Sequence, residues 1–252
     1  MKFLETHFTE YIQSHDKVCL HPSMKKTYAS FPNKIDQLKN IIFYGPSGVG
    51  KYTQMLAAIR KYSPSNLKYE KKLTCIYNKN NYYFKISDVH FEVDMSLLGC
   101  NAKLLWNEIY INILDVVSAR TNKSGIIVCK NFHKIHGELL DCFYSYLQKN
   151  NNNVADIKFI FLTESISFIP DNIINTFRII SINRPTKTLY AKISCNKPIN
   201  INLDEITNIK NLTTNTRSMQ HNMNIYVEHI YDLIKNPDTI KFISFRDIMY
   251  DI

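Results

Sequence analysis

The stretch NIIFYGPSGVGKYTQMLAAI, residues 40–59, decides the fold. It opens with the short apolar run IIFY, which is typical of a buried parallel strand. Gly45, Gly50 and Lys51 follow in the spacing G-x-x-x-x-G-K. The next segment, KYTQMLAAIRKY, has its apolar residues at helical spacing. Strand, glycine-rich loop and helix in this order predict a phosphate-binding loop.

The glycines of such a loop let backbone N–H groups turn inward toward phosphate oxygens, an approach that a Cβ atom would block. The helix that follows presents its N-terminus to the anion. Lys51 adds a point charge for the β- and γ-phosphates. The predicted cofactor is ATP or ADP, and the predicted binding residues are Gly45, Pro46, Ser47, Gly48, Val49, Gly50, Lys51, Tyr52 and Thr53.

One position departs from the motif. A Ser or Thr directly after the lysine ordinarily ligates Mg²⁺, but Tyr52 stands there and Thr53 comes one place late. The tyrosine oxygen is carried far out on a ring, and Thr53 lies about 100° further round the helix. The sequence therefore predicts poor coordination of Mg²⁺, and it leaves the role of Tyr52 open.

Hydrophobic segments alternate between strand and helix character along the chain. We expect two or three strands within 67–95, a long helix over 101–120, a buried strand over 125–129, a helix over 136–150, and two further buried strands over 157–164 and 177–185. This alternation predicts an α/β fold of the P-loop class, a parallel sheet flanked by helices, in residues 1–185. Residues 186–252 are expected to form a small, helical, lid-like domain. The apolar side of the long helix is expected to hold Leu104, Leu105, Ile109, Ile113 and Val116.

The 252-residue chain carries a formal net charge of +9, which suits a polyanionic partner, although the basic residues are spread out. The sequence has no apolar run of the roughly 20 residues that a membrane helix needs, and its N-terminus does not read as a secretory signal. Six scattered cysteines indicate reduced thiols in an intracellular protein. Cys129, His133 and His136 have only a partial likeness to a metal site, and we predict no structural metal.

The motif FYGPSGVGKYTQ is similar to the phosphate loop of replication factor C, the sliding-clamp loader of the AAA+ superfamily. Within that complex it is most similar to the small subunit that also has an extra residue between the lysine and the threonine. KISDVHFEVDMSLLGCNAKLLWNEIYINIL and IKFIFLTESISFIPDNIINTFRIISINRP also resemble that subunit, so the resemblance covers roughly residues 35–185. It implies an ATP-binding subunit in DNA replication, with other clamp-loader subunits, the sliding clamp and DNA as partners, in the nucleus or a cytoplasmic replication compartment. After Pro185 we expect a lid only, without a counterpart of the family's collar domain.

The same resemblance implies an acidic pair at the end of the strand GIIVC, where this chain has Lys130 and Asn131. It places Glu164 where the family has a water-orienting asparagine. The segment 175–177 stands where the family has an arginine finger, and Arg178 lies just beyond, in the predicted strand. These replacements predict nucleotide binding with slow or absent hydrolysis, and we assign no catalytic residue.

Several alternatives remain open at the level of sequence. The loop also resembles that of guanylate kinase, so an active nucleotide kinase or a free-standing ATPase is one alternative, and a nucleotide-free interaction module is another. Arg217 is the one candidate for a lid arginine. Tyr82, Tyr83 and Phe84 could stack on nucleic-acid bases, or they could simply face the sheet.

Overall fold

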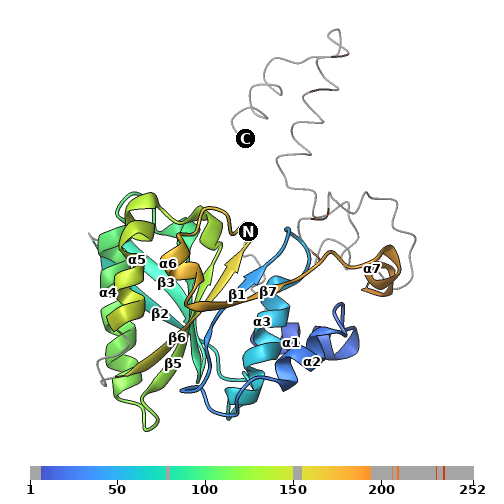
Figure 1. Ribbon diagram of the computed structural model, residues 1–252, viewed down its shortest axis with the longest axis horizontal. Helices are drawn as coiled ribbons and strands as arrows, with labels where there is room; N and C mark the ends of the chain where they lie inside the picture. The colour runs from blue at the N-terminus through green and yellow to red at the C-terminus, as the bar shows by residue number, and fades with distance from the viewer. Residues whose placement is uncertain are drawn as a thin grey trace, which may run out of the picture.

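The computed structural model describes residues 7–77, 80–149 and 155–193, together with the single residues 206, 209, 231 and 235. These residues form three layers, with a central sheet between two sets of helices (Figure 1). Helices α1, α2 and α3 lie on one side of the sheet, and α4, α5 and α6 lie on the other. The α/β class predicted from the sequence is confirmed.

The sheet has seven strands in the order β2-β3-β4-β5-β6-β1-β7. Strands β4, β5, β6, β1 and β7 run parallel to one another, whereas β2 and β3 are added at the β4 edge by antiparallel pairing. The strands are β1 (Asn40–Tyr44), β2 (Lys71–Tyr77), β3 (Asn80–Ile86), β4 (His90–Asp94), β5 (Ser124–Lys130), β6 (Asp156–Thr163) and β7 (Phe177–Ser181). Because the carboxyl ends of parallel strands meet at one edge, Tyr44, Asp94, Lys130 and Thr163 end on the same side of the molecule.

The long helices each bury one side against the sheet. They are α1 (Phe8–Lys17), α3 (Lys51–Ile59), α4 (Ala102–Ser118) and α5 (Gly137–Lys149). The shorter helices are α2 (Met24–Ala29), α6 (Asp171–Ile174) and α7 (Lys187–Ile193), and single 3₁₀ turns span Arg60–Tyr62, Met95–Leu97 and Phe132–Lys134. Helix α3 follows the glycine-rich loop directly, as the motif predicts.

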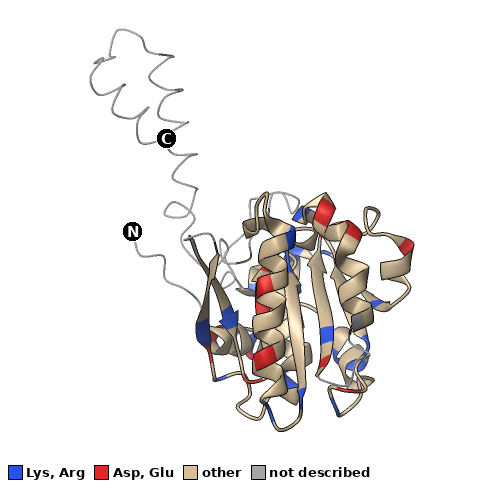
Figure 2. Ribbon diagram, turned by 90° about the vertical axis from the view of Figure 1, so that its left-hand side faces the viewer, with Lys and Arg blue, Asp and Glu red and all other residues tan. Residues whose placement is uncertain are grey.

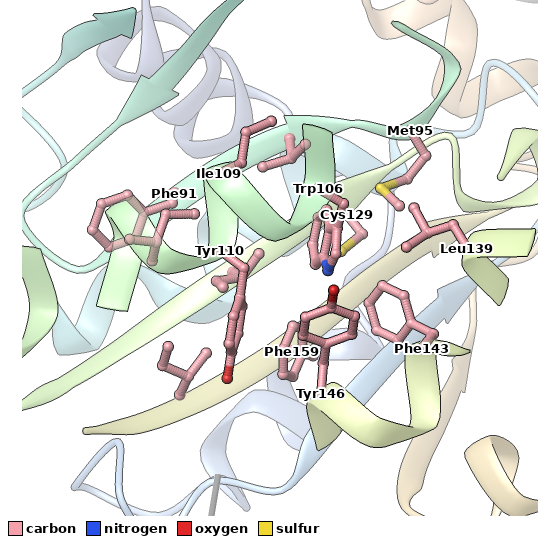
Figure 3. Packing of buried hydrophobic residues seen from close by; sticks show 14 of the residues in the cluster. Phe91, Met95, Trp106, Ile109, Tyr110, Cys129, Leu139, Phe143, Tyr146 and Phe159 are labelled. Carbon is pink, nitrogen blue, oxygen red and sulfur yellow. The ribbon is translucent and has the colours of Figure 1, made fainter. Parts of the chain in front are cut away.

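The larger hydrophobic core lies between the sheet and the α4–α5 pair, and it is rich in aromatic rings (Figure 3). Trp106 is fully buried and lies 5.2 Å from the Phe143 ring, centroid to centroid. Tyr146 meets Trp106 edge-on at 6.1 Å. Cys129 is buried in the same core, which raises the pKa of its thiol well above the ordinary value. Cys129 is therefore a packing residue, and no group of three or more metal-binding side chains occurs in the described ranges.

Two details differ from the sequence prediction. Strand β7 was expected to be buried, but it lies at the edge of the sheet, where β1 is its one partner among the described strands, and only Ile180 of its five residues is buried. On α4, Leu104 and Val116 are 59% and 37% exposed, while Leu105 and Ile109 are buried. The predicted apolar side of α4 was therefore displaced, because Trp106, Tyr110 and Val117 also face the core.

Basic residues are spread over strands, helices and loops, among acidic ones, in the view of Figure 2. Within the described part of the chain, no helix is long and apolar enough to cross a membrane. The predicted domain of residues 186–252 lies mostly outside the described residues, so the boundary near residue 185 remains a prediction. Arg217 also lies outside them.

Candidate functional site

The glycine-rich loop connects β1 to α3 at the carboxyl edge of the sheet. Gly48 and Gly50 have φ values of 68° and 87°, in the left-handed region that favours glycine. Gly45 packs so closely against the chain after β7 that a Cβ atom at this position would overlap the carbonyl oxygen of Ile182. Gly50 caps α3 without a side-chain hydrogen bond, so the first N–H groups of α3 suit an anionic ligand.

Lys51 begins α3 and folds back over the loop. Its Nζ atom donates to the carbonyl oxygens of Gly45 and Pro46, both at 2.7 Å, and lies 3.8 Å from Glu164 Oε1. Burial lowers the pKa of Lys51; the Glu164 carboxylate opposes that shift, and the Arg184 guanidinium adds to it. In this conformation the Lys51 ammonium group, which is predicted to bind phosphate, instead contacts two carbonyl oxygens of the loop and one carboxylate.

Two further side chains hold the loop from outside. The Tyr190 hydroxyl of α7 donates to the Gly48 carbonyl at 3.1 Å. His21 Nε2 lies 2.8 Å from the Val49 carbonyl oxygen and therefore donates to it. Both contacts fix peptide carbonyls of the loop, which is consistent with N–H groups that face the other way.

Tyr52 turns away from the loop into the layer between α3 and the sheet. Its hydroxyl donates to Glu92 Oε1 of β4 at 2.6 Å, and its ring meets Tyr11 of α1 edge-on at 4.8 Å. Burial raises the pKa of Tyr52 well above the ordinary value, and the Glu92 charge adds to the effect. Tyr52 is thus a link between α3 and β4. Thr53, one residue later, is half-buried.

Glu92 is the centre of a buried polar group at this point, with a side chain only 1% exposed. His90 Nε2 lies 3.2 Å from Glu92 Oε1, and His90 Nδ1 faces the Ser87 hydroxyl, so the imidazole links Glu92 to Ser87. Lys130 Nζ lies 3.5 Å from Glu92 Oε2, an oxygen with no hydrogen-bond partner. Burial would raise the pKa of Glu92, but His90, Lys130 and Tyr52 lower it overall.

Lys130 and Asn131 stand at the end of β5, where the resemblance implies an acidic pair. The ammonium group of Lys130 also lies 5.6 Å from the centre of the Tyr52 ring. Asn131 Nδ2 lies 3.0 Å from both carboxylate oxygens of Asp94, at the end of the neighbouring strand β4. Sequence reasoning missed Asp94, although the parallel pairing of HFEVD with GIIVC places it beside Lys130. Its Oδ1 atom also accepts hydrogen bonds from the backbone N–H and hydroxyl of Ser96.

Glu164, at the end of β6, bridges Lys51 and His133. Its backbone N–H donates to His133 Nδ1 at 3.4 Å, and its Oε2 atom lies 4.0 Å from His133 Nε2. Burial lowers the pKa of His133, so the imidazole is mainly neutral at neutral pH. A carboxylate at this place would repel a phosphate, and the pairing of Glu164 with Lys51 reduces that repulsion.

The structure separates Arg178 from this site. Its guanidinium donates to Ser30 Oγ at 3.3 Å and lies over the Phe31 ring at 5.3 Å. It also lines an open groove at the amino ends of β1, β6 and β7, opposite the glycine-rich loop. Arg178 therefore serves no arginine role at the loop of its own chain. Tyr83 is 63% exposed, whereas Phe84 is buried, so of this aromatic run Phe84 faces the core.

Comparisons with known proteins leave the family open. No protein-family profile matches the sequence. No curated protein matches it. Solved structures with a partial likeness include PCH-2 of Caenorhabditis elegans (TM-score 0.47, 9% identity, 73% of this chain and 49% of that one), a RuvB mutant of Thermotoga maritima (0.41, 11%, 75% and 52%) and RIF2 of Saccharomyces cerevisiae (0.44, 12%, 88% and 80%). The chain spans about half the length of the first two. At these scores the likeness does not carry their functions to this chain.

Proposed function

We propose that this protein binds ATP or ADP through the loop from Gly45 to Lys51 and hydrolyses ATP slowly or not at all. The observation that carries the proposal is the loop itself: it joins the carboxyl end of β1 to the N-terminus of α3, and its lysine begins that helix. Gly48 and Gly50 in left-handed conformations favour N–H groups that face an anion. Phosphate binding at such a strand–loop–helix junction is a general property of its geometry.

Slow hydrolysis follows from the carboxylates near the loop. Asp94 Oδ1 already accepts from Ser96 and Asn131, and Glu92 is buried behind Tyr52 and Lys130. Glu164 is the carboxylate nearest Lys51 among the described contacts, and it pairs with that lysine. A positioned general base contributes about 10²–10⁴ in rate. Each of these three carboxylates already pairs with another group, so we expect binding with little turnover.

Calorimetric titration with ATP and with ADP, in Mg²⁺ and in EDTA, tests the binding. We expect both nucleotides to bind, with little dependence on Mg²⁺, and Lys51→Ala to abolish binding. A wild-type protein that binds neither nucleotide would contradict the proposal, and the nucleotide-free interaction module would then be the better interpretation. Transfer of phosphate from ATP to a nucleoside monophosphate would replace it with a kinase function.

We further propose that the protein works in DNA replication beside clamp-loader subunits and the sliding clamp, in contact with DNA directly or through that complex. Support comes from the resemblance over residues 35–185 and from the positive net charge of +9. Native mass measurement of the purified protein mixed with clamp-loader subunits, with and without primed DNA, tests this role. A stable complex of defined mass is expected, and a protein that remains uncomplexed in every mixture would refute it.

A further inference from the structure

A second cation, Arg184, lies beside the glycine-rich loop. After β7 the backbone stays close to β1, because Ile182 N donates to the Tyr44 carbonyl at 2.7 Å and the Ile182 carbonyl contacts Gly45. Arg184 follows two residues later. The chain after β7 therefore brings the backbone of Arg184 near the start of the glycine-rich loop.

Arg184 is held in position by helix α7 and by Ile206. Its guanidinium hydrogen-bonds the Tyr190 hydroxyl, and that hydroxyl in turn donates to the Gly48 carbonyl. Its Nη1 atom also lies 3.5 Å from the Ile206 carbonyl oxygen. Tyr190 and Ile206 are buried in one small apolar cluster, and the side chain of Ile209 from the same cluster lies next to Gly50. Arg184 is thus ordered relative to the loop.

The two cations near the loop disfavour each other. Burial is the main cause of the lowered pKa of Lys51, and the positive charge of Arg184 lowers it further. Glu164 offsets only part of this charge, because its side chain is 42% exposed and lies 3.8 Å from the ammonium group. Two cations at one partly buried loop are favourable when an anion lies between them, which points to a ligand with several negative charges.

We propose that Arg184 binds the polyphosphate tail of the nucleotide together with Lys51, as a second and permanent positive charge. A guanidinium suits this role, since its planar fork donates two hydrogen bonds to one phosphate and keeps its charge at any physiological pH. The inference rests on the proposed nucleotide binding and deepens it. It also gives a reason for the expected weak dependence of binding on Mg²⁺, because two protein cations would supply the positive charge that Mg²⁺ supplies in other phosphate-binding loops.

The alternative is that Arg184 only fastens α7 and the Ile206 carbonyl to the core. Three substitutions separate the two roles. Arg184→Gln removes the charge, Arg184→Lys keeps it without the fork, and Tyr190→Phe keeps the charge but removes the link to Gly48. Arg178→Gln is the matched control, because Arg178 is on the same edge strand but contacts Ser30 and Phe31.

The experiment measures binding of ATP and of inorganic tripolyphosphate to each variant in EDTA, at several salt concentrations, with thermal unfolding in parallel. We expect Arg184→Gln to weaken both ligands about 10- to 100-fold, the range of one charge-assisted hydrogen bond, and to make the salt dependence shallower. Arg184→Lys should lose less, Tyr190→Phe should lose less than Arg184→Gln, and Arg178→Gln should match the wild type.

Wild-type affinity in Arg184→Gln, with binding still lost in Lys51→Ala, would overturn the inference and leave nucleotide binding intact. Equal losses in Arg184→Gln, Arg184→Lys and Tyr190→Phe would assign the effect to packing of α7 and also overturn it. A wild-type protein that binds neither ATP nor tripolyphosphate would remove the proposed function and the inference together.

Discussion

At the residue scale, one departure from the phosphate-loop motif changes the contacts around the loop. The residue after Lys51 is a tyrosine, and its hydroxyl reaches the buried Glu92 instead of the loop. Glu92 in turn lies beside Lys130, at the strand end where the resemblance implies a metal-organising acid. Tyr52, Glu92 and Lys130 therefore act as one structural unit between α3, β4 and β5.

Tyr52→Phe should destabilise the fold by about 1–3 kcal/mol, because it removes the shorter of the two hydrogen bonds to Glu92 Oε1, a buried carboxylate oxygen that then keeps only its contact with His90. Urea denaturation measures this change. Tyr62→Phe is the matched control, since it removes a hydroxyl that donates to the neutral carbonyl of Pro32 at 2.7 Å, and it should cost about 0.5–1.5 kcal/mol. An equal or smaller loss for Tyr52→Phe than for Tyr62→Phe would count against a charged Glu92.

Glu92 should also make stability depend on pH. Its pKa is lower in the folded protein than the ordinary carboxyl value near ~4.3, so its contribution is complete above that value and is lost as the pH falls toward the folded pKa. The unfolding free energy of the wild type should therefore drop more steeply below about pH 4.3 than that of Glu92→Gln. Denaturation curves from pH 3 to pH 7 give the comparison, and parallel slopes for the two proteins would refute it.

At the element scale, the loop depends on the strands on either side of it. Strand β1 lies between β6 and β7, and the residue after β7 hydrogen-bonds back to the end of β1. The close approach of Ile182 to Gly45 leaves no room for a side chain there. The loop is therefore positioned by backbone contacts between elements that are distant in sequence.

Gly45→Ala should destabilise the protein by about 1–3 kcal/mol, because its methyl group would force the Ile182 carbonyl away. Gly137→Ala is the control: Gly137 begins α5, and an added Cβ meets no atom within 4 Å. This substitution should be neutral or stabilise the protein by up to about 1 kcal/mol. Thermal unfolding of both variants tests the pair, and a neutral Gly45→Ala would contradict the described packing.

Helix α4 allows a second comparison between neighbours in sequence. Leu105→Ala should cost about 2–5 kcal/mol, because Leu105 is fully buried in the aromatic core. Leu104→Ala should change stability by less than about 0.5 kcal/mol, because Leu104 is 59% exposed. Chemical denaturation distinguishes them, and the reverse order would mean that the helix is rotated relative to the sheet.

At the scale of the whole molecule, the sequence predicts the layers better than the site. Apolar runs and glycines are local signals, so β1, the loop and α3 followed directly from residues 40–59, and the α/β class followed from the alternation of strands and helices along the chain. The edge position of β7 could not be predicted in this way. The apolar run IIS of β7 resembles the run IIF of the central strand β1, so composition does not show whether a strand has one neighbour or two. Burial along α4 was misjudged at Leu104 because aromatic residues elsewhere on the helix decide which side faces the core.

The site depends on contacts that sequence spacing does not show. Tyr52 and Glu92 are 40 residues apart, and Asn131 and Asp94 are 37 apart. Sequence reasoning examined Arg178 and Arg217 as candidate arginines, whereas Arg184 follows the contact between Ile182 and the first glycine of the loop. Pairing between parallel strands and the path of the chain after β7 decide these neighbours, and neither is a local property.

The central claim is that the loop holds a nucleoside triphosphate that the protein does not consume. The most direct measurement is the fate of ATP, labelled on its γ-phosphate, after it is bound to an excess of protein in Mg²⁺ and followed over hours. We predict that the label is recovered as ATP from the wild type and that Lys51→Ala retains none. Rapid release of labelled phosphate by the wild type, absent in Lys51→Ala, would contradict the account.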